Sequence, residues 1–397
     1  MSSSVGGCNK RGVCGPALGA HELVVAGVKL ILYDGQVNRA MTDPILKSAH
    51  TPAAVVAVCG WSGSGKTTLL ASVIPALVQS GLRVAVVKHC GHEPEADRPD
   101  KDSDRLFRTG ADVVLESPRG TVCRQHGESS DDIHALVTRL GADHDVVLVE
   151  GHKSTALPKV WLAQPDDPRV PADVCDVRAV LPWNGARRAA LHRVIEQELR
   201  AAAARRPLYT GILIGGGSTR MGRPKALLSC AGATFLEHVV GVARQHVQHI
   251  CLLGSGPTPP LDPPPTCIPD APGLSGPLAG VLAALRWAPG TCWLVLACDL
   301  PQLQPAALDW LIHQRAPGRW AVLPKVDAER VEPLLALYEP QALGLLETLA
   351  ARGVTALRSL AGEHSVHTPP VPNELRASWT NVNTPNELNQ LRGPDSI

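Results

Sequence analysis

The sequence lacks the marks of nucleic-acid-binding, exported and membrane-spanning proteins. It has no long basic or acidic block, and its 38 Lys and Arg against 37 Asp and Glu leave a formal net charge of +1. DNA or RNA is therefore not expected as the main partner. No basic stretch leads into an apolar run at the N-terminus, and the most apolar segment, LVVAGVKLIL, is short and interrupted by Lys29. Neither a signal peptide nor a membrane span is expected.

The cysteines do not suggest a disulfide framework. There are 11 of them, an odd number, and all but Cys8 and Cys14 are dispersed singly. This usage is typical of reduced thiols and predicts a cytoplasmic protein. The two cysteines of CNKRGVC make at most half of an iron–sulfur site. Residues 1–50 therefore remain an uncharacterised N-terminal segment, for which an accessory tail is the favoured interpretation.

Two α/β units are predicted after this segment. Residues 51–200 open with AAVVAVC and alternate short apolar strands with helical patterns. The stretch ELRAAAARRPL predicts a helix that frays into a linker at 201–208, with Pro207 as its end. Residues 209–397 restart the alternation of strand and helix. Strands that are apolar throughout and separated by helices predict parallel sheets covered on both faces.

The first unit carries a P-loop pattern, GWSGSGKTT, after a strand and at the start of a helix. In that context backbone N–H groups cradle phosphates, Lys66 reaches the β and γ oxygens, and the Thr67 hydroxyl ligates Mg²⁺. The carboxylate that completes such a site is expected from Glu150, at the end of DVVLVE, or from Asp97. No N-K-x-D follows, so the pattern itself does not specify guanine. The predicted nucleotide-binding residues of the loop are Gly60, Gly63, Ser64, Gly65, Lys66, Thr67 and Thr68.

The second unit opens with a different glycine loop, LIGGGSTRMGRPK, which lacks both the G-K-[ST] ending and the G-x-G-x-x-G frame. Small residues from Gly215 let the backbone approach a triphosphate, while Arg220 and Lys225 can meet charge on the α-phosphate and the departing pyrophosphate. Asp299, in CDLP, is predicted to hold Mg²⁺ at a strand end, although an aspartate there can also cap a helix. Lys225 is expected to be exposed and to change folding stability by no more than about 0.5 kcal/mol.

Both units resemble known families. The stretches AVCGWSGSGKTTLL, VVKHCGHEPEADRPDKDSDRLFRTGAD and DHDVVLVEGHK are similar, in order and spacing, to MobB, the GTP-binding proteins of molybdopterin guanine dinucleotide synthesis. This resemblance covers about Ala53 to Glu198. From Tyr209 to about Leu391 the chain resembles MobA, the molybdenum cofactor guanylyltransferases. That second resemblance rests on the glycine loop, IPD with GPLAGVLAAL, LACDLPQL, VEPLLALY and NVNTPNELNQL.

The resemblances imply an α/β chain in which a P-loop NTPase-like parallel-sheet domain precedes a Rossmann-like nucleotidyltransferase domain. They imply a multifunctional enzyme that transfers GMP from GTP to molybdopterin and releases pyrophosphate, with an auxiliary GTP-binding module that is at most a weak GTPase. Arg220, Lys225 and Asp299 would act in catalysis. The residues expected to contact GTP or Mg²⁺ in the second domain, besides Lys225 and Asp299, are Leu213, Ile214, Gly215, Gly216 and Asp270.

Two alternatives remain open from the sequence. The same fold serves cytidylyltransferases and other nucleotidyltransferases, and the whole chain could instead be a GTP-dependent carrier or adaptor of the cofactor. The partners expected are other molybdenum cofactor synthesis proteins and molybdoenzyme chaperones. The sequence does not distinguish molybdenum from tungsten.

Overall fold

The computed structural model describes residues 20–25, 28–33, 53–88, 105–106, 108–109, 113–117, 120–124, 132–183, 185–215, 223–230, 232–247 and 249–392. The chain divides into two units, Met1–Ala49 and His50–Ile397. In the first unit, β1 (Ala20–Val25) and β2 (Val28–Tyr33) form an antiparallel hairpin. Among the described residues, no helix combines the length and the apolar composition needed to cross a bilayer.

The larger unit begins with a parallel sheet of five strands in the order β4-β7-β3-β8-β9. The strands are β3 (Ala54–Gly60), β4 (Val84–Lys88), β7 (Val146–Glu150), β8 (Lys159–Leu162) and β9 (Val177–Leu181). Every neighbouring pair is parallel, which confirms the parallel sheet predicted for this region. A separate antiparallel hairpin joins β5 (Val113–Ser117) to β6 (Gly120–Arg124).

Helices cover both faces of this sheet because its central strands are apolar on both sides. On one face, α2 (Lys66–Gln79) and α5 (Arg187–Arg205) pack on Val56, Leu148 and Val160. On the other face, α4 (Ile133–Gly141) packs on residues of the opposite parity in the same strands, such as Val147 and Val149. Alternate residues of a strand point to opposite faces, so a strand buried on both sides reads as a continuous apolar run.

The second sheet has seven strands in the order β14-β13-β10-β15-β17-β16-β18. Their bounds are β10 (Leu208–Leu213), β13 (His249–Leu253), β14 (Thr266–Ile268), β15 (Cys292–Ala297), β16 (Ala321–Val322), β17 (Leu335–Tyr338) and β18 (Val366–His367). The first four are mutually parallel, but β17 is antiparallel to both β15 and β16. The strands predicted for this half, up to β15, are parallel as expected, whereas the antiparallel β17 was not predicted. The short segment between β16 and β17 returns the chain directly, without a crossover helix, and such a connection makes an antiparallel pair.

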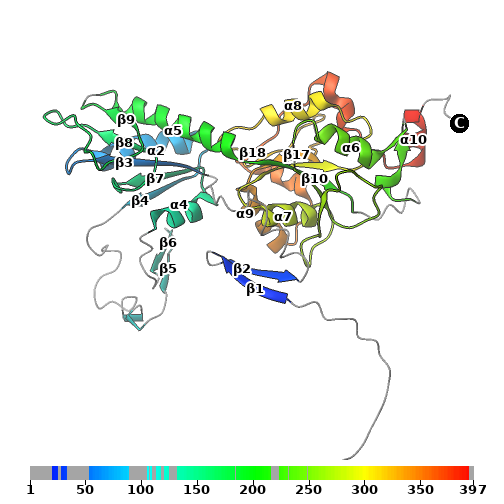
Figure 1. The fold of residues 1–397 in the computed structure, drawn as a ribbon, viewed down its shortest axis with the longest axis horizontal. Helices are drawn as coiled ribbons and strands as arrows, with labels where there is room; N and C mark the ends of the chain where they lie inside the picture. Colours follow the sequence, from blue (N-terminus) through cyan, green and yellow to red (C-terminus); the bar gives the residue numbers. More distant parts are fainter. Residues whose placement is uncertain are drawn as a thin grey trace, which may run out of the picture. The chain divides into compact units, whose positions relative to one another are not determined.

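The helices of this region lie in two layers on either side of the mixed sheet (Figure 1). One layer holds α7 (Pro277–Trp287) and α9 (Ala342–Ala351), and the other holds α6 (Phe235–Ala243) and α8 (Pro305–His313). A short hairpin, β11 (Ser229–Cys230) with β12 (Ala233–Thr234), leads into α6. The remaining elements are η2 (Lys225–Leu227), η3 (Leu357–Gly362), η4 (Asn373–Trp379) and α10 (Pro385–Arg392).

The connection between the two sheets is shorter than the sequence indicated. Helix α5 runs to Arg205 and β10 begins at Leu208, so most of the segment 201–208 proposed as a linker lies in regular structure. Arg206, between them, donates to Glu339 Oε2 at 2.9 Å, and Arg315 donates to Oε1 at 2.7 Å. Burial acts to raise the pKa of Glu339, but the two guanidinium groups outweigh it and the pKa is lowered.

A second buried contact joins the two sheets within the same unit. Trp320 Nε1 donates to Asp145 Oδ1 at 2.8 Å, and the backbone N–H of Arg83 donates to Oδ2 at 2.9 Å. The Arg83 guanidinium lies 5.1 Å from the centre of the Trp320 ring. Burial raises the pKa of Asp145, and these hydrogen bonds offset only part of that effect. Because Asp145 precedes β7 and Trp320 precedes β16, this contact lies away from the strand ends where the predicted site residues are found.

Candidate nucleotide sites

The first site is the loop between β3 and α2, whose backbone requires glycine. A Cβ added to Gly60 would lie 2.7 Å from Ser64 Oγ and 3.0 Å from the backbone oxygen of Leu162. Gly63 and Gly65 have φ of +72° and +82°, in the left-handed region that favours glycine. Gly65 is also the residue before α2, so the loop turns straight into the helix N-terminus. That geometry presents backbone N–H groups to an anion.

The structure brings together the two residues predicted to hold a metal at this loop. Thr67 Oγ1 lies 2.9 Å from both carboxylate oxygens of Glu150. Because β7 is the neighbour of β3, with Val58 opposite Glu150, the carboxylate reaches the first turn of α2. The Lys88 ammonium lies 3.6 Å from Glu150 Oε1. Hydroxyl and carboxylate oxygens are the ligands that Mg²⁺ prefers, so this pair fits a magnesium ion.

The remaining predicted residues of the loop differ in their surroundings. Lys66 Nζ donates to the backbone oxygens of Gly60 and Trp61 at 3.1 and 2.9 Å. Ser64 is fully buried, whereas Thr68 is exposed on the first turn of α2. Asp97, the alternative to Glu150, lies outside the described residues.

Sequence reasoning missed one residue of this loop's support, Arg187. Its Nη1 donates to the backbone oxygen of Ser64 at 3.0 Å, and its Nη2 donates to the backbone oxygen of Ala163. The guanidinium thus ties the P-loop to the loop after β8. The only signal in the sequence is a basic pair at the start of a helix, in GARRAA, which does not by itself point to the P-loop.

The second site lies at the carboxyl ends of β10 and β15, where Lys225 and Asp299 meet. Lys225 Nζ lies 2.6 Å from Asp299 Oδ2 and 2.6 Å from Asn383 Oδ1. The Asp299 side chain is 9% exposed and that of Lys225 is 24% exposed. Lys225 was expected to be an exposed lysine with little influence on folding. Instead it is mostly buried in an ion pair, because η2 turns it back onto the strand ends.

Asn383 is a site residue that the sequence analysis used only as part of a resemblance. It belongs to NVNTP, far from the glycine loop in sequence, and its backbone N–H donates to Glu387 Oε2 at 2.6 Å. The backbone N–H of its neighbour Val382 donates to the backbone oxygen of Asp299 at 3.2 Å. The C-terminal segment therefore closes one side of the Lys225–Asp299 pair.

Asp270 lies at the same edge of the sheet, beyond β14. A Cβ on Gly254 would come within 3.4 Å of its carboxylate, and a Cβ on Gly280 within 3.5 Å, so glycines surround this acid. Burial raises the pKa of Asp270. In the strand order, β14 and β15 lie on opposite sides of β10. Asp270 and Asp299 therefore stand on either side of the strand that opens the glycine loop.

The beginning of the glycine loop is held by its neighbours. The backbone N–H of Ile214 donates to the oxygen of Leu253, and the backbone oxygen of Leu213 accepts from Cys298. A Cβ on Gly215 would lie 3.7 Å from the oxygen of Ser255. Gly216 and Arg220 lie outside the described residues. Among the residues that are described, no group of three or more His, Cys, Asp or Glu is placed to hold a metal.

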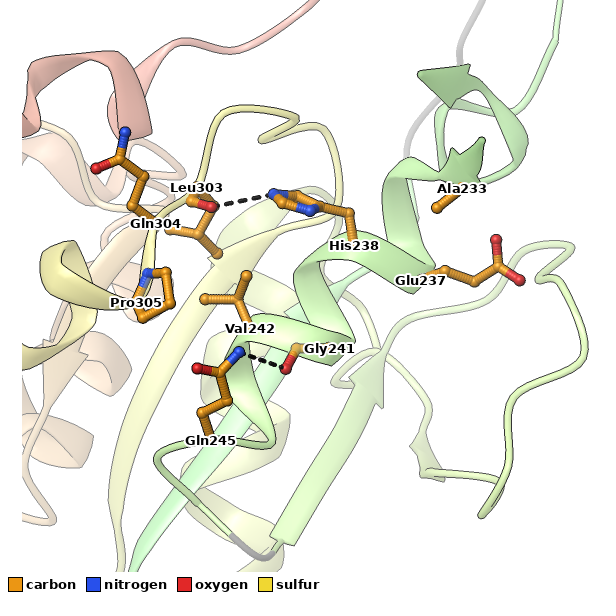
Figure 2. A pocket seen from close by; sticks show the side chains of 9 residues that line it. All are labelled: Ala233, Glu237, His238, Gly241, Val242, Gln245, Leu303, Gln304 and Pro305. Atoms are coloured by element: carbon orange, nitrogen blue, oxygen red, sulfur yellow. Dashed lines mark hydrogen bonds between the residues drawn. The ribbon is translucent and has the colours of Figure 1, made fainter. Parts of the chain in front are cut away.

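A hollow of about 460 Å³ lies elsewhere on this domain, between α6 and the start of α8 (Figure 2). His238 Nε2 lies 3.0 Å from the backbone oxygen of Leu303, and Gln245 Nε2 donates to the backbone oxygen of Gly241 at 3.4 Å. None of the predicted site residues lines it. Its lining residues are Ala233, Glu237, His238, Gly241, Val242, Gln245, Leu303, Gln304 and Pro305.

Fold and geometry thus define a P-loop domain joined to a nucleotidyltransferase-type α/β domain. Comparison with known families makes both assignments specific. Residues 55–181 match molybdopterin guanine dinucleotide synthesis protein B, MobB, and residues 210–368 match the MobA-like NTP transferase domain. The chain therefore contains a region that matches MobB, followed by a region that matches the MobA-like NTP transferase domain.

Relatives are found for each domain. The chain is 36% identical over 112 residues to the molybdopterin-guanine dinucleotide biosynthesis adapter protein of Escherichia coli, a match covering 27% of this chain and 64% of that protein. It is 28% identical over 192 residues to a Bacillus cereus protein named "Probable molybdenum cofactor guanylyltransferase", a match covering 46% of this chain and 96% of that protein. It is 32% identical over 151 residues to the molybdenum cofactor biosynthesis bifunctional protein of Synechocystis, a match covering 37% of this chain and 43% of that protein. The matches thus span less than two thirds of the Escherichia coli and Synechocystis proteins.

Solved structures also match each domain. A molybdopterin-guanine dinucleotide biosynthesis protein A from Archaeoglobus fulgidus matches 46% of this chain and 96% of its own, with 24% identity and a TM-score of 0.40. A MobB structure matches 37% of this chain and 98% of its own, with 28% identity and a TM-score of 0.30.

Proposed function

We propose that the second domain is a molybdenum cofactor guanylyltransferase, which transfers GMP from GTP to molybdopterin. An oxygen of the pterin's terminal phosphate attacks the α-phosphorus of GTP, and a new P–O–P bond forms. The bond from the α-phosphorus to the bridging oxygen of the β-phosphate breaks, and pyrophosphate leaves with that oxygen. The observation that carries this proposal is the Lys225–Asp299–Asn383 cluster at the carboxyl ends of β10 and β15, in a MobA-like domain.

The chain's own groups would act by position and charge. Lys225, already held by two oxygen partners, would turn its ammonium toward the negative charge that builds up on the phosphates. Arg220 keeps its predicted role at the departing pyrophosphate. No general base is required, because the attacking phosphate is ionised at neutral pH. Catalysis then rests on orientation and electrostatic stabilisation.

Magnesium fits this site through its carboxylates. Asp299 and Asp270 offer hard oxygen ligands on either side of β10, and Mg²⁺ typically takes one or two carboxylates together with substrate phosphates. When bound, the ion would neutralise charge on the triphosphate. The carboxylate of Asp299 would then be shared between the Lys225 ammonium and the metal.

The first domain is proposed as an auxiliary GTP-binding module. Lys66 would neutralise the β and γ phosphates, while Thr67 and Glu150 would hold Mg²⁺. The adapter name of the Escherichia coli relative supports an auxiliary role. Other molybdenum cofactor synthesis proteins and molybdoenzyme chaperones are the partners proposed for it.

The test is an assay of the purified chain with Mg²⁺, molybdopterin and one nucleotide at a time. We expect pyrophosphate release and a dinucleotide product with GTP, and much less of either with CTP. Faster turnover of CTP would assign the cytidylyl reaction instead. Binding of GTP and molybdopterin without pyrophosphate would make the chain a carrier or adaptor.

A further inference from the structure

An exposed aromatic ring lies beside the P-loop without a role in the functions proposed above. Trp183 stands two residues after the end of β9 and keeps 51% of its surface exposed. The Arg187 guanidinium lies 4.6 Å from the centre of its ring. One side of the ring is thus supported by a cation, and half of the residue remains open to solvent. An exposed tryptophan held in this way is suited to stacking.

Arg187 fixes the position of this ring relative to the P-loop. The same guanidinium that supports Trp183 donates to the backbone oxygen of Ser64 at 3.0 Å, and its Nε donates to the oxygen of Pro182 at 2.7 Å. Only one side chain therefore separates the ring from the loop that would cradle phosphates. A second hydrogen bond joins the segment after β8 to the P-loop, because Gln164 Nε2 donates to the backbone oxygen of Ser62 at 3.2 Å.

The sheet order places Trp183 on the side of the P-loop away from the metal carboxylate. Glu150 ends β7, on one side of β3, whereas Trp183 and Arg187 follow β8 and β9 on the other side. Ligands of parallel α/β sheets bind outside the carboxyl ends of the strands. If the phosphates and metal of a nucleotide lie toward Glu150, its nucleoside part would extend along the ends of β8 and β9, where Trp183 stands.

We infer that Trp183 is a stacking platform for the nucleobase of a nucleoside triphosphate bound at the P-loop. The inference rests on the proposed GTP-binding role of the first domain and adds to it the base-binding surface. The base lies on the ring face opposite Arg187. Stacking of this kind tolerates any base, because every base has a π-face. Trp183 therefore contributes affinity for the nucleoside part and leaves the choice between guanine and adenine to other groups.

The experiment compares ligands with and without a base. Binding of GTP, ATP and inorganic triphosphate is measured by calorimetry in the full-length protein carrying Lys225→Ala, which weakens the second site. Trp183→Ala should weaken GTP and ATP binding by the same factor, about 5- to 150-fold. The affinity for inorganic triphosphate should stay the same. Trp183→Phe should retain most of the affinity, since it keeps a ring. Val180→Ala, at a residue 45% exposed on β9, is the matched control and should change nothing.

The outcomes separate this inference from the function on which it rests. If GTP and inorganic triphosphate both weaken in Trp183→Ala, the ring only supports Arg187 and the P-loop, and the platform is refuted. Unchanged GTP binding in Trp183→Ala refutes it as well. If Lys66→Ala leaves GTP and triphosphate binding unaltered, the first domain has no P-loop nucleotide site, and the proposed function of that domain fails.

Discussion

Replacing Lys225 by alanine should lower both stability and turnover, and the two losses should respond differently to a second substitution. The variant removes the ammonium that lies 2.6 Å from Asp299 Oδ2. Asp299 would then be a carboxylate with only 9% of its side chain exposed that has lost its Lys225 partner. Removing one partner of a buried ion pair strands the other charge, and that is the main source of the stability loss.

The size of the loss follows from burial. Breaking a fully buried pair costs about 3–5 kcal/mol, whereas an exposed pair contributes about 0–1 kcal/mol. Lys225 is 24% exposed, so water would enter and recover part of the solvation of Asp299. We expect a loss of about 1–3 kcal/mol. In a domain of about 150–250 residues this lowers Tm by roughly 2–12 °C.

The assay is a double-mutant cycle with Asp299→Asn, followed by thermal unfolding and by dinucleotide formation. Asparagine has the shape of aspartate without the charge, so Lys225→Ala combined with Asp299→Asn should be more stable than Lys225→Ala alone. Turnover should stay about 10²-fold or more below wild type in all three variants, because both charges serve the transition state. A wild-type Tm in Lys225→Ala, or a double variant that is the least stable of the three, would show that the Asp299 charge is not what destabilises Lys225→Ala.

Three further predictions concern the first domain and its buried contact. Thr67→Val should weaken GTP binding in the presence of Mg²⁺ but leave binding in a chelator nearly unchanged, as calorimetry would report, since only the metal ligand is lost. Arg187→Lys should weaken inorganic triphosphate binding by about 10-fold, because a point cation cannot reproduce the fork that holds the backbone oxygen of Ser64. GTP binding should weaken further, because the same guanidinium supports the Trp183 ring; wild-type affinity for both ligands would exclude that support. The raised pKa of Asp145 means that its ionisation costs stability at neutral pH, so wild type should gain stability relative to Asp145→Asn as the pH falls from 7 towards 4, and a gap that is constant with pH would contradict this.

The sequence predicted most of the first domain because its signals are local. A P-loop is one continuous stretch between a strand and a helix, and Glu150 ends a strand that reads as apolar throughout. The contact of Glu150 with Thr67 then follows from β7 lying beside β3. Arg187 was not predictable, since its contact with Ser64 joins residues 123 apart in sequence.

The second domain shows where local reading fails. The strands up to β15 were expected to be parallel and are, but the reversal at β17 depends on a connection without a helix. Lys225 was expected to be exposed because it stands next to a glycine-rich loop. Its burial arises from Asp299 and Asn383, which approach from two distant segments. A single sequence does not show which distant residues come into contact in the fold.

One chain is proposed to carry a guanylyltransferase site together with a separate P-loop site. The decisive measurement follows GTP labelled at the α-phosphate, with Mg²⁺ and molybdopterin, in wild type, Lys66→Ala and Asp299→Ala. We expect wild type and Lys66→Ala to place the label in a pterin dinucleotide, with one pyrophosphate released for each. We expect Asp299→Ala, folded by its circular dichroism, to form none. Loss of the product in Lys66→Ala, or its persistence at wild-type rate in Asp299→Ala, would show that the two sites are not separate or that Asp299 is not catalytic.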